Sequence, residues 1–478
     1  MARDQKNDTH PVIVWIRRDF RLSDNPALAA ANRTGRPVIP VFIADETFDR
    51  LGAAPEWRLK LGLLHFLDRL RQAGSGLVYR QGHALTVLEE LVAETGAVGV
   101  YWNRAYHPDE IERDRKVKRE LKAQSLDAKS FPGNLIFEPW EVTTGTGGFY
   151  RVFTPFWKNV RQVQATPPCA APSRLSAPVA WPRSDDLANW AARHRMARGA
   201  EIVRPHLLRG EQAAQERLET FCDTQLRNYS KDRDFPARPA TSGLSEPLAY
   251  GEISPRQIWF HVMRLWQAGV TGTDTFLKEL VWREFAYHLM FHTPRMLTRN
   301  WREEWDAFPW NKDDKHPHVI SWKRGRTGMA FVDAAMREMY VTGRMHNRGR
   351  MIVASYLTKH LMTDWRIGQR WFENCLTDWD PASNAMGWQW AAGSGPDAAP
   401  YFRVFNPETQ LNKFDPGGDY SNAWIAEGRR HARDTARCYF RAIPCSWSMS
   451  VEDAYLSPIV SPQEGRERAL SAYHNRSF

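Results

Sequence analysis

The chain has 478 residues, of which 42% are hydrophobic, so it is long enough for two or more domains that each bury a core. Its 65 lysines and arginines exceed its 55 aspartates and glutamates, and the net charge of +10 favours a polyanionic partner, nucleic acid first. The N-terminus has no apolar signal core, and no apolar run approaches the length of a bilayer span, so we expect a soluble, cytoplasmic protein without membrane contact.

The cysteines and tryptophans narrow the classes of site. The five cysteines are widely scattered and form no Cys-x-x-Cys pair, which disfavours a disulfide framework and a zinc or iron–sulfur cluster, so we expect no metal. The 21 tryptophans are an unusually high number. Aromatic faces provide packing mass and also stacking platforms for bases or cofactor rings.

Residues 10–140 alternate short β-branched runs with helical patterns. Apolar residues recur at helical spacing from Leu63 to Leu70 and from Val87 to Val92. Strands that alternate with helices predict an α/β domain with a doubly wound parallel sheet, Rossmann-like in architecture. The first strand is followed by charged residues from Arg17 onward and not by Gly-x-Gly-x-x-Gly, so the fingerprint of a nicotinamide dinucleotide site is absent. The predicted strands are Val12–Ile16, Val38–Ile43, Leu77–Tyr79 and Val98–Trp102.

Residues 141–207 are predicted to connect this domain to a second one, because the stretch from Thr166 to Pro182 is rich in Pro, Ala and Ser. From residue 208 to residue 478 long amphipathic patterns replace the strand patterns, which predicts an all-helical domain. One of these patterns carries an apolar stripe from Phe276 to Leu289. On the face next to this stripe lie Glu279, Trp282 and Arg283.

The stretch from Asp378 to Trp390 is the candidate cofactor site. Its thirteen residues hold two carboxylates together with amide and indole side chains. Arg350 lies upstream, and because a buried charge needs a partner we expect it to pair with Asp378. Two close carboxylates beside arginines suit a polar, partly anionic aromatic ligand. A basic, tryptophan-rich helical binder of nucleic acid without a cofactor is the alternative that these residues leave open.

Three segments, Met345–Met351, Asp378–Trp390 and Pro400–Pro407, resemble the flavin-binding signature of the photolyase and cryptochrome family. The resemblance is closest to the cyclobutane pyrimidine dimer photolyases, and it extends along nearly the whole chain. It implies a helical domain that binds one FAD per chain, and a monomeric carbon–carbon lyase whose partner is UV-damaged DNA that contains pyrimidine dimers.

The resemblance assigns FAD contacts to two groups of residues. The turn from Thr241 to Ser245 precedes a helical pattern, so its hydroxyl and N–H groups can meet a phosphate at a helix N-terminus. An amide at Asn384 can accept a hydrogen bond from protonated flavin N5 and donate one to the oxidised form. The residues implied for the adenine dinucleotide portion are Tyr229, Thr241, Ser242, Leu244, Ser245 and Arg283. Those implied for the isoalloxazine and ribityl portions are Arg350, Asp378, Asp380 and Asn384.

The resemblance also implies an electron path and a lesion pocket. Trp388, Trp365 and Trp310 match the three tryptophans that carry an electron from the surface to the photoexcited flavin. The indoles and polar groups of the pocket suit a thymine dimer that is flipped out of the duplex; photolyases are a standard example of enzymes that flip their target bases. The residues implied for the dimer are Glu279, Trp282, Asn347, Arg348, Met351 and Trp390, and those expected near the DNA phosphates are Arg348, Lys323, Arg324 and Arg326.

The implied reaction is driven by light and causes no net redox change. Excited reduced FAD donates an electron to the dimer, the cyclobutane bonds split, and the electron returns. Glu279 would stabilise the dimer radical anion by a hydrogen bond if its carboxyl group is protonated or bridged. Glu279, Asn384 and the three tryptophans of the electron path are therefore the predicted catalytic residues.

The antenna site is where the chain departs from the family pattern. Asp109 and Glu110 fall where folate-binding members have an Asn-Glu pair, so methenyltetrahydrofolate, a deazaflavin and FMN all remain open as a second chromophore. Two other functions in the family are alternatives. Members that repair (6-4) photoproducts have a His-His pair where this chain has His346 and Asn347, and cryptochromes sense blue light without repairing DNA.

Overall fold

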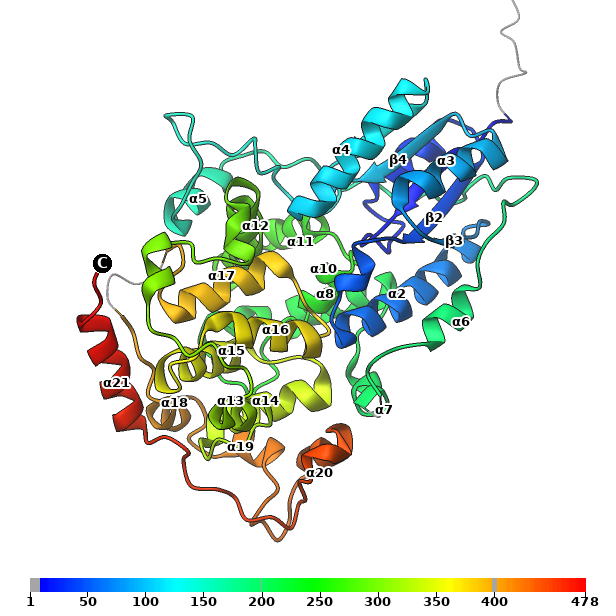
Figure 1. Cartoon of the computed structure of the whole chain (residues 1–478). Helices are drawn as coiled ribbons and strands as arrows, with labels where there is room; N and C mark the ends of the chain where they lie inside the picture. The colour runs from blue at the N-terminus through cyan, green and yellow to red at the C-terminus, as the bar shows by residue number, and fades with distance from the viewer. Residues whose placement is uncertain (1–8, 198, 398–401) are drawn as a thin grey trace, which may run out of the picture.

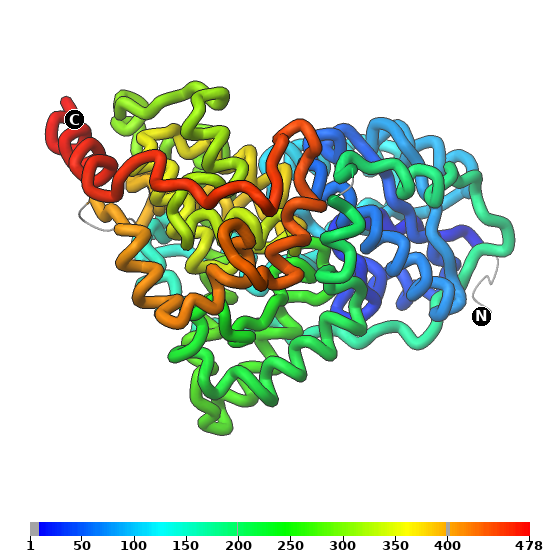
Figure 2. The backbone as a smooth tube through the Cα atoms, turned by 90° about the horizontal axis from the view of Figure 1, so that it is seen from below, coloured from blue at the N-terminus to red at the C-terminus, as the bar shows by residue number. Residues whose placement is uncertain are grey.

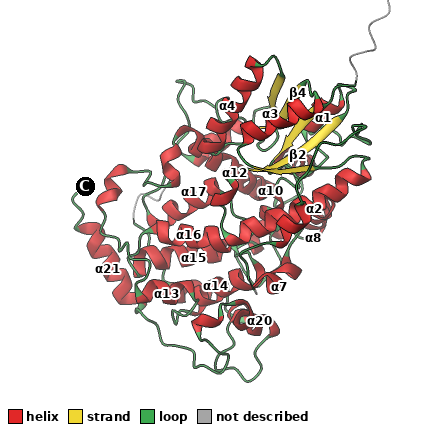
Figure 3. Ribbon diagram, turned by 45° about the vertical axis from the view of Figure 1, so that its right-hand side comes forward, coloured by secondary structure: helices red, strands yellow, loops and turns green. Residues whose placement is uncertain are grey.

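The computed structural model describes residues 9–197, 199–397 and 402–478, so the first two residues of the Pro400–Pro407 motif lie outside the described residues. A five-stranded sheet forms one end of the molecule, and helices form the rest (Figure 1; Figure 3). The strands near the N-terminus and the C-terminal helix α21 (Pro462–His474) lie at opposite ends of the molecule in Figure 2.

The sheet is parallel, in strand order β3-β2-β1-β4-β5, and β1 at its centre is buried along its whole length. Val12, Val14 and Ile16 pack on the side of two helices, and Ile13 and Trp15 pack on the side of two others. Helices on both faces bury every strand residue at the centre, and the predicted doubly wound sheet is confirmed. The strands are β1 (Val12–Ile16), β2 (Val38–Ala44), β3 (Val78–Gln81), β4 (Gly99–Asn103) and β5 (Asp127–Phe131). The helices of the first face are α1 (Pro26–Asn32) and α2 (Ala53–Gln72), and those of the second are α3 (Ala84–Thr95) and α4 (Pro108–Ala123).

The four predicted strands are present, Val12–Ile16 with its predicted bounds and the other three with ends shifted by one or two residues, but β5 was not predicted. This strand reads Asp-Ala-Lys-Ser-Phe, and only Ala128 within it is buried. It pairs on one side alone, with β4, at the edge of the sheet. A short polar run at an edge has neither the apolar content nor the alternation by which strands are recognised.

The predicted connector lies against the sheet domain and contains short helices. The backbone N–H of Val38 donates to the oxygen of Ser176 at 2.7 Å, and the N–H of Asp185 donates to the oxygen of Tyr79 at 2.8 Å. These bonds hold the Pro-rich stretch along the first half of the chain. The helices of this segment are α5 (Phe153–Val160), α6 (Leu187–Ala192) and α7 (Gly199–Val203).

The second half is helical, as predicted. Its described residues add only an isolated bridge between Asn311 and Thr363 to the strands listed above. No helix within residues 9–197, 199–397 and 402–478 combines the length and the apolar content that crossing a membrane requires. The helices are α8 (Glu211–Thr224), α9 (Tyr229–Asp232), α10 (Ser245–Ala249), α11 (Pro255–Gln267), α12 (Thr273–His292), α13 (Pro317–Lys323), α14 (Ala330–Thr342), α15 (Asn347–Ser355), a π-helical turn (Tyr356–His360), α16 (Trp365–Cys375), α17 (Pro381–Ala392), α18 (Pro407–Phe414), α19 (Asp419–Trp424) and α20 (Asp434–Ala442).

Buried charge pairs join the two halves. Arg58 on α2 is fully buried and forms ion pairs with Glu246 and Glu252 of the helical half. Removing one partner of a buried charge network leaves an uncompensated charge, so these contacts fix the position of α2. Nearby, the backbone N–H of Ala53 donates to the side chain of Asn374 at the end of α16. The sheet and the helices that carry the predicted cofactor residues are therefore in direct contact.

Candidate functional site

The expected pair of Arg350 and Asp378 is present in the structure. Nη2 of Arg350 donates to both oxygens of Asp378, at 2.9 and 2.7 Å, and its Nε donates to the backbone oxygen of Met345 at 2.9 Å. Asp378 is 5% exposed. The pair joins the first turn of α15 to the loop before α17. A buried carboxylate is stable only with its cation beside it, so the pair holds these two segments together.

The first turn of α17 places Asn384. Asp380 caps this helix, its Oδ1 accepting from the N–H of Ser383 at 2.7 Å, and Pro381 occupies the first helical position. The other oxygen of Asp380 accepts from the hydroxyl of Tyr287 at 2.6 Å. Nδ2 of Asn384 donates to the backbone oxygen of Asp380 at 2.9 Å. This bond orients the amide and leaves its Oδ1 as the acceptor for a ligand.

The turn from Thr241 to Ser245 is held by an arginine that was not predicted. Arg217 donates to the backbone oxygens of Ser242 and Thr241, at 2.7 and 2.6 Å. A Cβ added at Gly243 would lie 3.6 Å from Nε of Arg217 and 3.7 Å from Nη1 of Arg344, so both guanidiniums lie beside this turn. Burial and the neighbouring Arg344 lower the pKa of Arg217. Two cations this close favour an anion between them.

The predicted helix after this turn is short. α10 begins at Ser245 but has only five residues, so its dipole is small. The attraction for a phosphate therefore comes mainly from the two guanidiniums and the hydroxyl and N–H groups of the turn. Tyr229 packs nearby in the core, edge-on to Phe221 and Phe276.

Arg283 lies on the side of the cofactor residues that faces the sheet. Its Nη1 donates to the backbone oxygen of Asn134 at 3.1 Å, and its guanidinium lies 4.8 Å from the ring of Tyr287. Tyr287 in turn donates to Asp380, so Arg283 is linked to the first turn of α17. The sequence assigns this residue to the adenine dinucleotide portion; in the structure without ligand its contacts are Asn134, Glu284 and Tyr287.

The outward face of α15 brings together three of the predicted lesion residues. Nδ2 of Asn347 lies 4.0 Å from the sulfur of Met351, and Nη1 of Arg348 lies 3.8 Å from the same sulfur. Arg348 also pairs with Asp234 at 2.7 Å and lies over the ring of Phe414. Residues at helical spacing share a face, so the polar and the thioether groups present one surface.

Three predicted phosphate contacts lie elsewhere on the helical half, at the end of α13 and in the turn that follows it. The guanidinium or ammonium groups there contact aromatic rings or a carboxylate of neighbouring segments. The pairs are Lys323 with Trp371, Arg324 with Trp447 and Arg326 with Asp453.

Glu279 is paired with an arginine that the sequence pattern did not single out. Arg233 forms an ion pair with Glu279 and lies over the ring of Tyr229, 5.3 Å from its centroid. Glu279 is one-third exposed, so the pair faces solvent on one side. The guanidinium places hydrogen-bond donors beside the carboxylate.

The two predicted wedge tryptophans belong to different parts of the core. Trp282 stacks on Phe153 with 3.7 Å between ring centroids, so one of its faces is covered by the connector helix α5. Trp390 packs against the other large cluster of the helical half, around Trp388. Both tryptophans are partly exposed. Trp282 therefore contributes at most one open face to a ligand.

The three tryptophans of the predicted electron path are all buried. Trp388 is 2% exposed and meets Phe372 and Trp322 edge-on, at 4.9 and 6.1 Å between centroids. Trp365 is fully buried and Trp310 is 6% exposed. Trp322, which the sequence did not single out, is a fully buried neighbour of Trp388.

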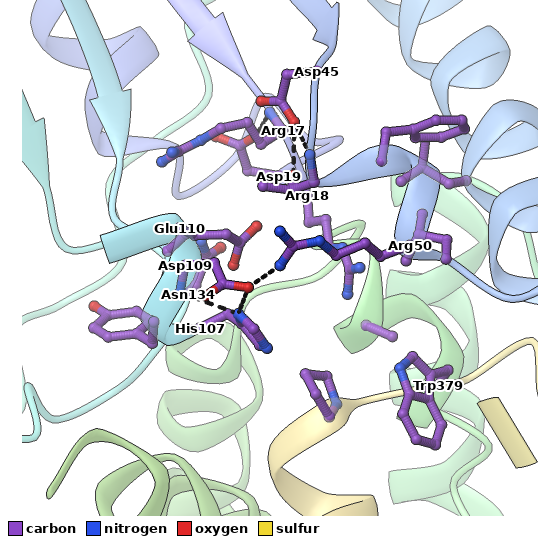
Figure 4. Close-up of a pocket in the computed structure, with 18 of the residues that line it drawn as sticks. Arg17, Arg18, Asp19, Asp45, Arg50, His107, Asp109, Glu110, Asn134 and Trp379 are labelled. Atoms are coloured by element: carbon purple, nitrogen blue, oxygen red, sulfur yellow. Dashed lines mark hydrogen bonds and ion pairs between the residues drawn. The ribbon is translucent and has the colours of Figure 1, made fainter. Parts of the chain in front are cut away.

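A cavity of about 160 Å³ lies outside the carboxyl ends of β1, β2 and β4 (Figure 4). Chain order reverses between β1 and β4, which is where parallel sheets of this type bind ligands. Asp109 and Glu110, the predicted antenna residues, both line this cavity, and Asp109 pairs with Arg50. The other cationic groups of its wall are Arg17, Arg18, Arg113 and Arg283.

Five arginines and five carboxylates line this cavity, so its formal charges balance and its wall is strongly polar. Burial opposes ionisation of Glu110, but Arg113, Arg18 and Arg17 outweigh it and lower the pKa of the carboxyl. Trp379 lies across the cavity from Glu110 in Figure 4, and Pro381 also lines the cavity. Since these two residues directly adjoin Asp378 and Asp380, the cavity reaches the back of the candidate cofactor site.

Comparison with known proteins identifies the family. A family model for the FAD binding domain of DNA photolyase matches residues 276–475, and one for DNA photolyase matches residues 12–173. A deoxyribodipyrimidine photo-lyase from Agrobacterium fabrum is 44% identical over 471 residues, which are 97% of this chain and 98% of that protein. The chain belongs to the DNA photolyase family. Cryptochrome-1 of Arabidopsis thaliana is also related, at 35% identity over 96% of this chain and 70% of that protein.

Solved photolyase structures share the fold. A bacterial class III photolyase from Agrobacterium tumefaciens superposes with a TM-score of 0.90 at 43% identity and covers 99% of both chains. An archaeal photolyase from Sulfolobus tokodaii that holds two FAD molecules superposes with a TM-score of 0.80 at 29% identity, over 97% of this chain and 100% of that one. The predicted combination of a Rossmann-like domain and a helical FAD-binding domain is therefore confirmed.

The chemistry of the helical site fits the FAD that this photolyase family binds. The matched FAD-binding domain contains the Arg350–Asp378 pair and Asn384. At the other end of the site, Arg217 and Arg344 suit a diphosphate, because neighbouring guanidiniums bind phosphate oxygens well. An oriented amide, a buried ion pair and a cationic turn together provide groups for each part of the dinucleotide.

Proposed function

We propose that this protein repairs cyclobutane pyrimidine dimers in DNA with blue light, as a deoxyribodipyrimidine photolyase. The observation that carries the proposal is the double role of α15. Its inner side pairs Arg350 with Asp378 in the FAD-binding domain, and its outer side presents Asn347 and Met351 together. One short helix thus connects the flavin to a surface whose amide and thioether suit a pyrimidine pair.

Bound reduced FAD supplies, on excitation, the electron that splits the dimer. Asn384 holds its Oδ1 free as an acceptor because its Nδ2 is committed to Asp380. Asp380 is itself held by Ser383 and Tyr287, so the amide is fixed before any ligand binds. Arg350 offsets negative charge on the reduced ring, while Asp378 keeps the guanidinium in place.

On the lesion side, the ion pair between Arg233 and Glu279 places hydrogen-bond donors at the edge of the dimer. The guanidinium can share its N–H groups between the carboxylate and a pyrimidine carbonyl that gains charge. Trp390 and the open face of Trp282 supply stacking surfaces for the flipped bases. Arg348 is available for a backbone phosphate if the DNA displaces its partner Asp234.

We assign a second chromophore to the cavity outside the carboxyl ends of the strands, with Asp109, Glu110 and their neighbouring arginines as contacts. Because Trp379 and Pro381 line this cavity, a chromophore bound there would absorb light close to the flavin site. The absorption spectrum of the purified protein would distinguish a folate, a deazaflavin and a flavin.

We also expect the protein to act in the cytoplasm as a monomer, which fractionation and light scattering would test.

The decisive experiment is incubation of the reduced holoprotein with an oligonucleotide that contains one thymine dimer, under blue light. We expect the lesion to disappear and thymine absorbance to recover, whereas an identical sample kept dark should not change. An oligonucleotide with a (6-4) photoproduct should remain unrepaired. Light-dependent flavin chemistry without loss of either lesion would contradict repair and favour a cryptochrome-type sensor; Cryptochrome-1 of Arabidopsis thaliana is a relative of this chain.

A further inference from the structure

A second cavity, of about 400 Å³, lies in the helical half beside the outermost tryptophan of the proposed electron path. That volume falls in the range of small-molecule sites, roughly 300–1,000 Å³. Its aromatic wall consists of Trp305, Phe308 and Trp310, and the rings of Trp305 and Trp310 stack at 5.7 Å between centroids. Because Trp310 is only 6% exposed, a molecule from solvent approaches its ring through this cavity.

The cavity is cationic. Four cationic side chains line it against two carboxylates, a net charge of +2. Arg366 is engaged by both carboxylates, at 2.8 Å from Asp364 and 3.6 Å from Asp306. The other three cations are exposed and have no ion-pair partner among the residues that the structure describes; they are Arg299, Lys312 and Arg370.

The outer indoles have no base at their N–H groups. Nε1 of Trp310 donates to the backbone oxygen of Thr358 at 3.0 Å, and Nε1 of Trp365 donates to Oδ1 of Asn300 at 2.8 Å. Amide oxygens accept hydrogen bonds but do not take up protons at neutral pH. An indole that is oxidised at either position is a cation until it loses its proton, and neither of these oxygens takes up that proton, so an anion beside the ring is attracted.

We propose that this cavity binds a small, planar, anionic reductant of the enediolate class, with ascorbate as the simplest example, and that the bound anion reduces oxidised Trp310. The inference rests on the electron path of the proposed function, in which Trp310 is the outermost donor. The three exposed cations attract the anion, and the aromatic wall offers an apolar face to a flat ring.

The step transfers one electron and makes no bond to the protein. The enediolate monoanion is oxidised to a radical and releases a proton to water, and the Trp310 cation is reduced to the neutral indole. The photoreduced flavin then keeps its electron, because the hole on the tryptophan path has been filled. An uncharged donor gains nothing from the three cations, so the cavity selects donors by charge.

The test uses holoprotein with oxidised FAD, illuminated anaerobically at a series of ascorbate concentrations. We expect the rate of flavin reduction to saturate with ascorbate and to rise linearly with dithiothreitol, which is uncharged. Lys312→Ala/Arg370→Ala should raise the half-saturating ascorbate concentration by roughly ten-fold and leave the dithiothreitol rates unchanged, since it removes two nearby charges. Calorimetric titration of ascorbate in the dark should show the same weakening without photochemistry.

A matched control is Arg115→Ala/Lys116→Ala, which removes two exposed cations from α4. Equal ascorbate dependence in the two double variants would overturn the inference. Trp310→Phe distinguishes a failure of the proposed electron path from a failure of the proposed donor site. If this variant photoreduces at the wild-type rate with both donors, the electron path itself is wrong. If it loses photoreduction while the cavity variant keeps wild-type ascorbate dependence, only the donor site is wrong.

Discussion

Gly368 on α16 is the position where a single methyl group tests the packing of the electron path. A Cβ added there would lie 2.1 Å from Cη2 and 2.4 Å from Cζ3 of Trp388, and 2.7 Å from Cδ2 of Leu357. Ordinary carbon contacts lie at about 3.5–4.0 Å, so the indole would have to retreat by more than about 1 Å. Trp388 is 2% exposed, with Phe372 and Trp322 against its edges, so it has little room to move.

Two opposing effects set the expected stability of Gly368→Ala. Inside a helix, Ala is favoured over Gly by about 1 kcal/mol. Overpacking a dense core costs about 1–3 kcal/mol, and here three atoms are approached too closely. We expect the clash to prevail, with a net loss of up to about 2 kcal/mol. The assay is the urea midpoint of the holoprotein, followed by circular dichroism, together with the initial rate of flavin photoreduction, which should fall as Trp388 is displaced.

The chain offers a matched control in Gly387→Ala. Gly387 lies within α17, and a Cβ added there would meet nothing within 4 Å. With no clash, this variant should be as stable as the wild type or more stable by up to about 1 kcal/mol. If Gly368→Ala showed the same urea midpoint as Gly387→Ala and the wild-type rate of photoreduction, our account of how Trp388 is held against α16 would be refuted.

Three further predictions concern the site residues. Trp388→Phe should abolish photoreduction of oxidised FAD but leave repair by chemically reduced protein intact, as transient absorption and the dimer assay would show; retained photoreduction would mean another first donor. Trp390→Ala should weaken binding to dimer-containing DNA by about 1–3 kcal/mol, the range for bases stacked on aromatic rings, measured by fluorescence anisotropy; unchanged affinity would remove Trp390 from the lesion pocket. Burial raises the pKa of Glu338 to about 7 from 4.5, although Tyr420 and the N–H of His346 donate to it. The folded state therefore holds a proton that the unfolded state releases, so this part of the stability is complete below pH 4.5 and is lost as pH rises through about 7. Glu338→Gln should flatten that slope in urea midpoints taken across the range; an unaltered slope would assign it to other groups.

The sheet was predictable where burial was complete. All residues of β1, β2 and β4 except Asn103 are apolar because helices cover both faces of these strands, so their sequences reveal them directly. β5 was missed because it lies at an edge and buries only Ala128. The stripe of α12 was likewise readable, because its buried residues recur at helical spacing.

The ion pair of Arg350 with Asp378 could also be predicted, because charges in an apolar region need partners and these two were the candidates at hand. The roles of Arg233 and Arg217 could not be predicted from the sequence. Among 65 basic residues nothing local distinguishes them, and their roles arise only when the fold brings them to Glu279 and to the Thr241–Ser245 turn. The cover of Trp282 by Phe153 is equally a product of tertiary structure.

The two helices of the site are positioned at their first turns, and this explains how one scaffold serves both ligands. His346 caps α15, its Nδ1 accepting from the N–H of Arg348 at 3.1 Å, and Asp380 caps α17. Caps satisfy the free N–H groups of a first turn and so fix its orientation. Asn347, Arg350 and Met351 project from the first two turns of α15, and Asn384 projects from the first turn of α17. Because Arg350 and Asn347 share one capped turn, a shift of α15 toward the dimer would also strain the pair with Asp378, so the distance between donor and lesion is set by the fold and not by either ligand.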